Sequence, residues 1–298
     1  MDASQQIVKQ LPPIDLKSLF DIIQIDSNTY KGVQVLAKPN ESDRGAYGGN
    51  IAGAVVAVAI RSSPANFVPH SLHSFFIKAV SDEIPVIWKV ETISSGRTFV
   101  NKFIKGYQNN QIVYTANISL TTKNSTSKTS HRNNSKINYH TPLKGEPEVP
   151  INEAPTVFKM PSLFTFQKLS PYAREDTSAS YVLSFGISND SKFNQPLTNH
   201  EIREFKYAGI TTLTDWIVLE ILLPRLDIDI RPRFQASIDH NVYYHDDDFK
   251  LNQFITYVLQ LKWIGNDRAV IKGDIYTEDK RQIISILQER LFITSIKL

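Results

Sequence analysis

The sequence predicts an α+β protein built from two copies of one unit, in which an antiparallel sheet wraps around a central helix. Three observations lead to this prediction. The same order of one helix and four β-rich runs occurs twice along the chain. Within each copy the β-rich runs are joined by tight turns, which are too short for the crossovers that parallel strands need. The first helical stretch is apolar almost all round, so it must be buried on most of its sides.

The first unit begins with a helical stretch of small apolar residues, GNIAGAVVAVAIR, at residues 49–61. Runs rich in β-branched and aromatic residues follow it, and turns rich in Ser, Gly and Asn separate the later ones. These features predict a helix followed by four antiparallel strands. The strands are predicted at residues 71–76, 85–93, 98–107 and 111–120.

The second unit repeats this order. A helical stretch, GITTLTDWIVLEILL, is predicted at residues 209–223. The run QIVYTANISL of the first unit overlays QIISILQERL of the second, and SLHSFF overlays SIDHNVYY. The chain therefore contains an internal repeat. The four strands of this second copy are predicted at residues 236–244, 254–263, 269–276 and 282–291.

A polar segment separates the two copies. Residues 121–150 are rich in Ser, Thr, Asn, Lys and Pro and show no periodicity, as is typical of a solvated linker. This divides the chain into an N-terminal domain of residues 1–120 and a C-terminal domain of residues 151–298. A sheet wrapped around a buried helix is the hotdog arrangement. Two copies predict a double hotdog whose sheets lie edge to edge.

Composition excludes several classes of protein. The 298 residues are 41% apolar and 21% charged, which is the balance of a globular protein. The net charge of +3 is too small and too evenly spread to indicate a nucleic-acid partner. There is no cysteine, which excludes disulfides and a cysteine nucleophile. The start of the chain lacks a secretory signal and the longest apolar run, 51–60, is about half a membrane span, so neither export nor a membrane span is expected.

Several catalytic motifs are also missing from the sequence. No Gly-x-Ser-x-Gly elbow occurs, and the glycines at positions 45, 48 and 49 do not follow dinucleotide or P-loop spacing. The histidines lack the paired spacing of a zinc site, and residues 246–248, three aspartates, are interpreted as a turn. We therefore expect no cofactor and no metal. His73 and His240 are interpreted as hydrogen-bonded strand residues.

Four motifs and the repeat carry a resemblance to a known family. Residues 44–50 (RGAYGGN) are similar to Val-Phe-Gly-Gly-Gln, and residues 70–76 (HSLHSFF) match His-Ser-Leu-His-Ser-Tyr-Phe. Residues 95–99 (SGRTF) match Asp-Gly-Arg-Ser-Phe, and residues 236–240 (ASIDH) match Ala-Thr-Leu-Asp-His. The chain thus resembles the acyl-CoA thioesterase II family over most of its length. The resemblance implies a double hotdog that hydrolyses fatty acyl-CoA to free acid and coenzyme A.

The resemblance also implies three catalytic residues. The family holds its attacking water with an Asp, a Thr or Ser, and a Gln, and the matching positions are Asp215, Ser237 and Gln288. Gln288 lies in a run similar to the family's Val-Gln-Glu-Gly, here Leu-Gln-Glu-Arg at 287–290. The chemistry agrees, because a water fixed by a carboxylate, a hydroxyl and an amide can attack a thioester without a covalent intermediate. Asp215 would accept the proton, and backbone N–H groups at a helix start would bind the oxyanion.

Each of these residues also has a purely structural interpretation. Asp215 could cap or pair within an apolar helix, Ser237 could satisfy a strand edge, and Gln288 could be an exposed strand position. Two other functions also remain open from sequence. One is an enoyl-thioester hydratase, which would need a histidine base beside an Asp or Asn on the helix. The other is a non-catalytic acyl-CoA-binding protein, which would need none of the three polar residues.

The last residues, Ser-Ile-Lys-Leu at 295–298, are close to the Ser-Lys-Leu peroxisomal address. They predict a peroxisomal location and an import receptor as partner; if they are only the end of a strand, the protein is expected to be cytoplasmic. Asn50 replaces the family's usual Gln, and residues 78–80 stand where Arg-Pro-Gly is common. The acyl-chain preference, the residues that bind CoA and the number of subunits, a homo-oligomer included, stay open.

Overall fold

The computed structural model describes residues 16–38, 43–122, 198–216, 232–250, 255–277 and 281–294, together with the backbone of four strands between residues 156 and 187. All of the described strands belong to one sheet. The N-terminal unit contributes two helices and six strands. They are α1 (Leu16–Phe20), β1 (Ile22–Gln24), β2 (Thr29–Gly32), α2 (Gly48–Arg61), β3 (Val68–Phe76), β4 (Ile87–Ser95), β5 (Phe99–Gln108) and β6 (Gln111–Thr121).

The C-terminal unit contains one described helix and nine strands. Four of these strands precede the helix, and they lie where the sequence predicted no element. The elements are β7 (Thr156–Lys159), β8 (Phe164–Lys168), β9 (Tyr172–Ala173), β10 (Ala179–Ile187), α3 (Asn199–Thr214), β11 (Pro232–Ser237), β12 (Asp239–Tyr244), β13 (Ile255–Gly265), β14 (Arg268–Thr277) and β15 (Gln282–Thr294).

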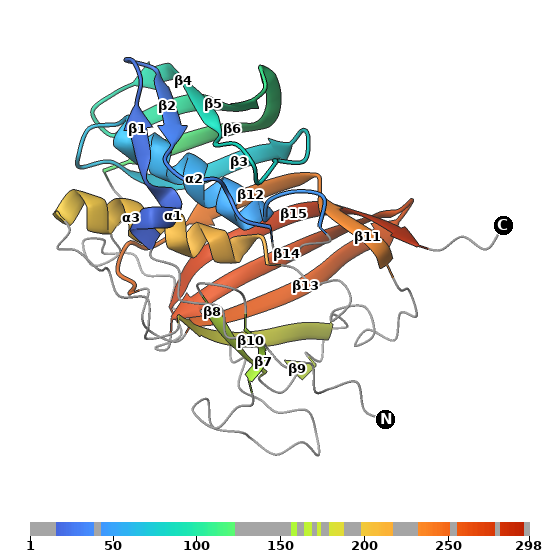
Figure 1. Ribbon diagram of the computed structural model, residues 1–298. Coiled ribbons are helices and arrows are strands. Elements are labelled where there is room, and N and C mark those ends of the chain that lie inside the picture. The colour runs from blue at the N-terminus through green and yellow to red at the C-terminus, as the bar shows by residue number, and fades with distance from the viewer. Residues whose placement is uncertain are drawn as a thin grey trace.

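The strands are paired antiparallel throughout, along the order β1-β2-β4-β5-β6-β3-β12-β15-β14-β13-β10-β8-β7, with β11 on β15 and β9 on β10. The two units meet where β3 pairs with β12, with Phe75 opposite Asp239 and Ser71 opposite Tyr243. The sheets are thus joined edge to edge, as predicted (Figure 1). Two hairpins use the same turn chemistry. Asn109-Asn110 and Asn266-Asp267 all have positive φ, which Asn and Asp tolerate better than other side chains.

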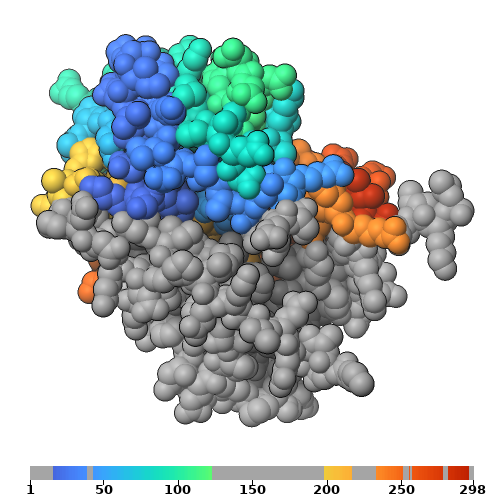
Figure 2. Space-filling view, viewed as in Figure 1, coloured from blue at the N-terminus to red at the C-terminus, as the bar shows by residue number. Residues whose placement is uncertain are grey.

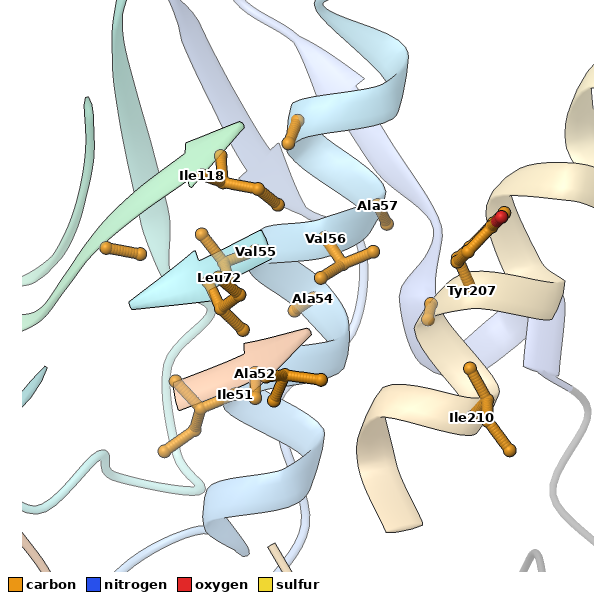
Figure 3. Packing of buried hydrophobic residues seen from close by; sticks show 14 of the residues in the cluster. Ile51, Ala52, Ala54, Val55, Val56, Ala57, Leu72, Ile118, Tyr207 and Ile210 are labelled. Atoms are coloured by element: carbon orange, nitrogen blue, oxygen red, sulfur yellow. The ribbon is translucent and has the colours of Figure 1, made fainter. Parts of the chain in front are cut away.

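Helix α2 confirms the predicted central helix of the first unit. Every residue from Gly49 to Ile60 is buried, which its small apolar side chains permit. Val55 lies toward Leu72 and Ile118 of the surrounding strands (Figure 3).

Helices α2 and α3 pack against each other in antiparallel directions. Near the start of α2, Gly49 lies against the Thr212 carbonyl oxygen near the end of α3. At the other end, Arg61 is paired with Glu204. In between, the close-up shows Val56 and Ala57 on the side toward Tyr207 and Ile210 (Figure 3). Small residues on α2 allow this close approach, because a Cβ on Gly53 would lie 2.8 Å from the Ala208 carbonyl oxygen.

Two sequence predictions differ from the structure. The second helix was predicted at 209–223, but α3 begins at Asn199 and ends at Thr214. Its N-terminus is fixed by a capping box, in which the Thr198 hydroxyl accepts from the Glu201 N–H and the Glu201 carboxylate accepts from the Thr198 N–H. Residues 217–223 of the predicted helix lie outside the described residues. The linker was predicted at 121–150, but Thr121 is the last residue of β6. Residues 123–150 of that linker also lie outside the described residues.

Candidate active site

The three predicted site residues lie on three different elements. Asp215 directly follows α3, Ser237 is the last residue of β11, and Gln288 lies on β15. The structure brings all three side chains together. Ser237 Oγ donates to Asp215 Oδ1 at 2.8 Å, and Gln288 Nε2 donates to the same carboxylate oxygen. A carboxylate that accepts from a hydroxyl and an amide is held in one orientation.

Burial tests the structural interpretation of Gln288. Gln288 has no exposed surface and Asp215 is 4% exposed, so the interpretation of Gln288 as an exposed strand position is wrong. Asp215 is also not inside the helix, as the predicted span implied, but forms its C-cap. Gln288 Oε1 is buried and has no hydrogen-bond partner among the described residues. An acceptor in this position leaves room in the hydrogen-bonding scheme for a donor such as water.

The start of α2 contacts the same carboxylate. A Cβ on Gly48 would overlap Asp215 Oδ2 and lie 3.0 Å from the Phe76 ring, so only glycine allows this contact. The Tyr47 hydroxyl donates to the Thr212 carbonyl oxygen at 3.0 Å, which ties the start of α2 to the end of α3. Since α2 begins at Gly48, the N–H groups of Gly48 and Gly49 have no acceptor within the helix, whereas those of Asn50 and Ile51 donate to the Tyr47 carbonyl oxygen at 3.0 and 3.3 Å. The N–H groups of the two glycines therefore lie beside Asp215.

The sequence did not single out the groups that surround Asp215. The Tyr257 hydroxyl donates to the Thr214 carbonyl oxygen at 2.9 Å and so holds the end of α3. Burial raises the pKa values of Tyr47 and Tyr257 well above the usual range, and the charge of Asp215 adds to this. Both hydroxyls therefore stay protonated. An aromatic residue before a Gly-Gly helix start was visible in the sequence, but its contact with a distant helix was not.

His73 and His240, both interpreted from sequence as hydrogen-bonded strand residues, lie in different environments. His73 Nδ1 lies 3.0 Å from Asn241 Oδ1, so its interpretation as a hydrogen-bonded strand residue is confirmed. His240 is fully buried, and its ring nitrogens have no close hydrogen-bond partner among the described residues, although a backbone interaction with Thr214 favours its protonated form, so its interpretation as a hydrogen-bonded residue stays a prediction. Burial lowers the pKa of His240, while the nearby charge of Asp215 opposes that shift.

The described part of the chain contains neither a metal-binding cluster nor a membrane-spanning helix. No cluster of three or more His, Asp or Glu side chains there could hold a metal ion. Among the same residues, no helix has the length and hydrophobicity needed to cross a bilayer.

Both halves of the chain match thioesterase families. Residues 37–121 match the family described as Acyl-CoA thioesterase N-terminal domain, and residues 191–291 match the family described as Acyl-CoA thioesterase. Human acyl-coenzyme A thioesterase 8 is 21% identical over 299 residues, covering 93% of this chain and 90% of the human protein. Peroxisomal acyl-coenzyme A thioester hydrolase 1 of Saccharomyces cerevisiae is 27% identical over 104 residues, which are 35% of this chain and 30% of the yeast protein.

The fold is similar to that of a solved structure, an acyl-CoA thioesterase II from Mycobacterium marinum. The TM-score is 0.72 at 19% identity, and the match covers 95% of this chain and 100% of the other. The fold and the family matches together define a double-hotdog thioester hydrolase. The chain belongs to the acyl-CoA thioesterase II family, and its activity is the hydrolysis of acyl-CoA. The predicted fold, family and activity are thereby confirmed.

Proposed function

We propose that Asp215 is the general base of this hydrolysis and that Ser237 and Gln288 orient it and the attacking water. The observation that carries the proposal is the shared oxygen. Asp215 Oδ1 accepts from both neighbours, which leaves Oδ2 to accept a proton. Gln288 Oε1, buried without a partner among the described residues, supplies a second acceptor for the same water. Two acceptors fix both hydrogens of a water and point a lone pair at the carbonyl carbon.

The reaction then needs no covalent intermediate. The water oxygen bonds to the thioester carbon while one water proton passes to Asp215, and the carbonyl electron pair moves to oxygen. Collapse of this tetrahedral species breaks the C–S bond. The departing thiolate takes the proton from Asp215, which restores the carboxylate and leaves acid and coenzyme A. The N–H groups at the start of α2 lie beside Asp215 and are the proposed donors to the oxyanion.

The test is Asp215→Asn, which keeps the shape of the side chain and removes the proton acceptor. Release of thiol from palmitoyl-CoA should fall by about 10²- to 10⁴-fold in kcat, the range of a lost general base, with KM nearly unchanged. Ser237→Ala and Gln288→Ala should each lower kcat less. Their effects should be non-additive, because all three residues act on one water.

Asp239→Asn is the matched control. This nearby carboxylate accepts from the Glu289 N–H at 2.6 Å and from Asn241 Nδ2 at 3.0 Å, so both of its oxygens are used within the sheet. The folded control should turn over at the parental rate. If Asp215→Asn keeps parental turnover and Asp239→Asn loses it, the general base is Asp239. Hydration of enoyl-CoA, followed in parallel, should be absent from all variants.

We further propose that the protein acts in the peroxisome after delivery by an import receptor. Support comes from the Lys-Leu ending at 297–298, which lies outside the described residues, and from the name of the yeast relative. Removal of the last three residues should move a tagged protein to the cytosol, whereas an unchanged location would refute the role of the tail.

A further inference from the structure

An arginine lies beside the proposed catalytic residues. Arg290 follows Gln288 by two positions on β15, so strand alternation places both side chains on the face of the sheet that carries Asp215. In the strand pairing Arg290 is opposite Ser237. Its Nη1 lies 3.4 Å from the Asp215 backbone oxygen, a long hydrogen bond. The family's run resembled by this segment has glycine at this position, so the arginine is a departure of this chain.

The guanidinium is incompletely paired. Arg290 Nε is buried and has no hydrogen-bond partner among the described residues. A buried cationic donor without an acceptor costs more than a neutral one, and such a group calls for a partner that arrives with a ligand. Arg268 on the adjacent strand shows the contrast. Its Nη1 donates to Glu289 Oε1 at 3.0 Å, and its side chain is 43% exposed.

Two features identify the class of partner. The unpaired atom is an N–H donor on a cation, so it fits an anionic oxygen. It is also buried, and a doubly charged phosphate of coenzyme A would keep a large hydration shell that does not fit a buried donor. The thioester oxygen is small and becomes negative only when water attacks the carbon beside it. It forms beside Asp215, where Arg290 lies.

We propose that Arg290 is a further catalytic residue, whose Nε–H donates to the thioester oxygen as that oxygen becomes negatively charged. The inference rests on the proposed role of Asp215, which fixes where the attacked carbon lies. Arg290 keeps its proton throughout. It supplements the N–H groups of α2, and after the C–S bond breaks it faces the carboxylate of the product acid. In a water-excluded site such a donor stabilises the transition state more than the ground state.

The experiment compares Arg290→Gln and Arg290→Lys with Arg268→Gln, a matched loss of positive charge on the opposite face of the sheet. For Arg290→Gln, kcat for palmitoyl-CoA should fall by about 10²- to 10³-fold, the effect of losing one oxyanion donor. Arg290→Lys should recover part of that loss. Arg268→Gln should keep the parental kcat, and melting temperatures should establish that each variant is folded.

Two unreactive probes separate transition-state from ground-state contacts. A hexadecyl thioether of coenzyme A lacks the carbonyl oxygen, so Arg290→Gln should bind it within about twofold of the parent. A trifluoromethyl ketone analogue forms a tetrahedral hydrate, and its binding should weaken in parallel with kcat.

Unchanged kcat in a folded Arg290→Gln would overturn the inference, as would weaker thioether binding at constant kcat, which would assign Arg290 to the coenzyme. Neither result touches the role of Asp215, which depends on Asp215→Asn alone.

Discussion

The Asp215 carboxylate lies where two helix ends meet. Asp215 is the C-cap residue of α3, at a helix end where backbone carbonyls disfavour a negative charge, and its Oδ2 contacts Gly48 at the N-terminus of α2, where N–H groups favour one. The same N-terminus would favour the negative charge that develops on the substrate. The balance between these two effects depends on how closely the N-terminus of α2 approaches the Asp215 carboxylate. Gly48, which has no side chain, allows that close approach.

Gly48→Ala should therefore impair catalysis although alanine is the better helix former. The added methyl group would overlap Asp215 Oδ2 and press on the Phe76 ring, so the carboxylate must move. A displacement of about 1 Å at a reacting group can lower kcat by about 10²-fold. Steady-state kinetics of the folded variant provide the measurement. Gly96→Ala is the control, because a Cβ there meets nothing closer than 3.4 Å. Parental kcat in Gly48→Ala would refute the proposed constraint.

Single residues also mark what sequence can and cannot predict about the site. Asp215, Ser237 and Gln288 were predicted because short motifs carry them at matching places. Arg290 stands two positions after Gln288, and alternation alone puts both on one face. The sequence does not reveal that this face meets the end of α3. Contacts made between distant elements, such as the Tyr47 hydroxyl on Thr212, were beyond prediction for the same reason.

At the level of elements, an ion pair clamps α2 to α3. Arg61 Nε and Nη2 donate to the two Glu204 carboxylate oxygens, each at 2.7 Å. Glu204 has no exposed surface, and burial raises its pKa even though Arg61 opposes the shift. A buried carboxylate depends on its partner, because removal of the cation leaves the charge uncompensated.

Arg61→Leu should consequently destabilise the protein by about 3 kcal/mol, the cost of breaking a buried pair. The double variant Arg61→Leu/Glu204→Leu should recover much of this loss, since it removes the stranded charge together with its partner. Urea denaturation at neutral pH measures both. Equal stability of the single and double variants would show that the cost comes from lost packing of the arginine stem. Lys17 forms a partly exposed ion pair in which its Nζ lies 3.3 Å from Glu201 Oε1. Lys17→Leu should therefore change the free energy of unfolding by less than about 1 kcal/mol.

The second helix shows how a strong pattern can mislead. The apolar run from position 209 onward favoured a helix there, whereas α3 begins ten residues earlier in a more polar stretch. The start signal was present in the sequence, because Thr198 and Glu201 have the spacing of a capping box. The first half of α3 faces the surface and its second half is buried, so the hydrophobic pattern of this one helix changes along its length. Helix α2, buried almost throughout, gave no such ambiguity.

At the scale of the whole molecule, the junction between the units places the proposed site. In Figure 2 the blue residues of the N-terminal unit lie against orange and red residues of the C-terminal unit. Arg44, just before α2, lies 4.7 Å from the centre of the Phe234 ring on β11. Short turns predicted antiparallel neighbours within each unit. The pairing of β3 with β12 joins residues far apart in sequence, so local patterns could only suggest it.

Acid should weaken the fold through histidines that are wholly or partly buried. Burial lowers the pKa values of His240, which is fully buried, and of His70, which is partly buried, below their ordinary value of 6.5. The unfolded chain then binds more protons than the folded protein once the pH falls to that value, so unfolding takes up protons and stability falls with the pH. The loss begins near the unfolded pKa and continues down to the lowered folded pKa. Asp215, Asp239 and Arg290 are the charged groups that face His240, and the two carboxylates oppose the effect of burial.

His240→Gln should flatten this dependence, because the variant keeps a polar side chain and loses the titrating ring. The measurement is the change in melting temperature between about pH 7.5 and about pH 5.5, where a histidine of ordinary pKa titrates. The slope is compared and not the absolute stability, since glutamine will pack differently in a fully buried position.

His73→Gln is the matched control, because His73 is exposed and its loss should leave the slope unchanged. Groups whose pKa is raised in the fold, such as Glu204, contribute equally to the pH dependence of the parent and of both variants, so their contributions cancel in the comparison. An unaltered slope in folded His240→Gln has two explanations. The first, that His240 stays neutral in the unfolded chain as well, is excluded by the ordinary pKa of histidine. The second is that a hydrogen-bond partner inside the fold stabilises the protonated ring. The second outcome would give His240 a hydrogen-bonded role next to Asp215 and would contradict the origin of acid sensitivity argued from its burial.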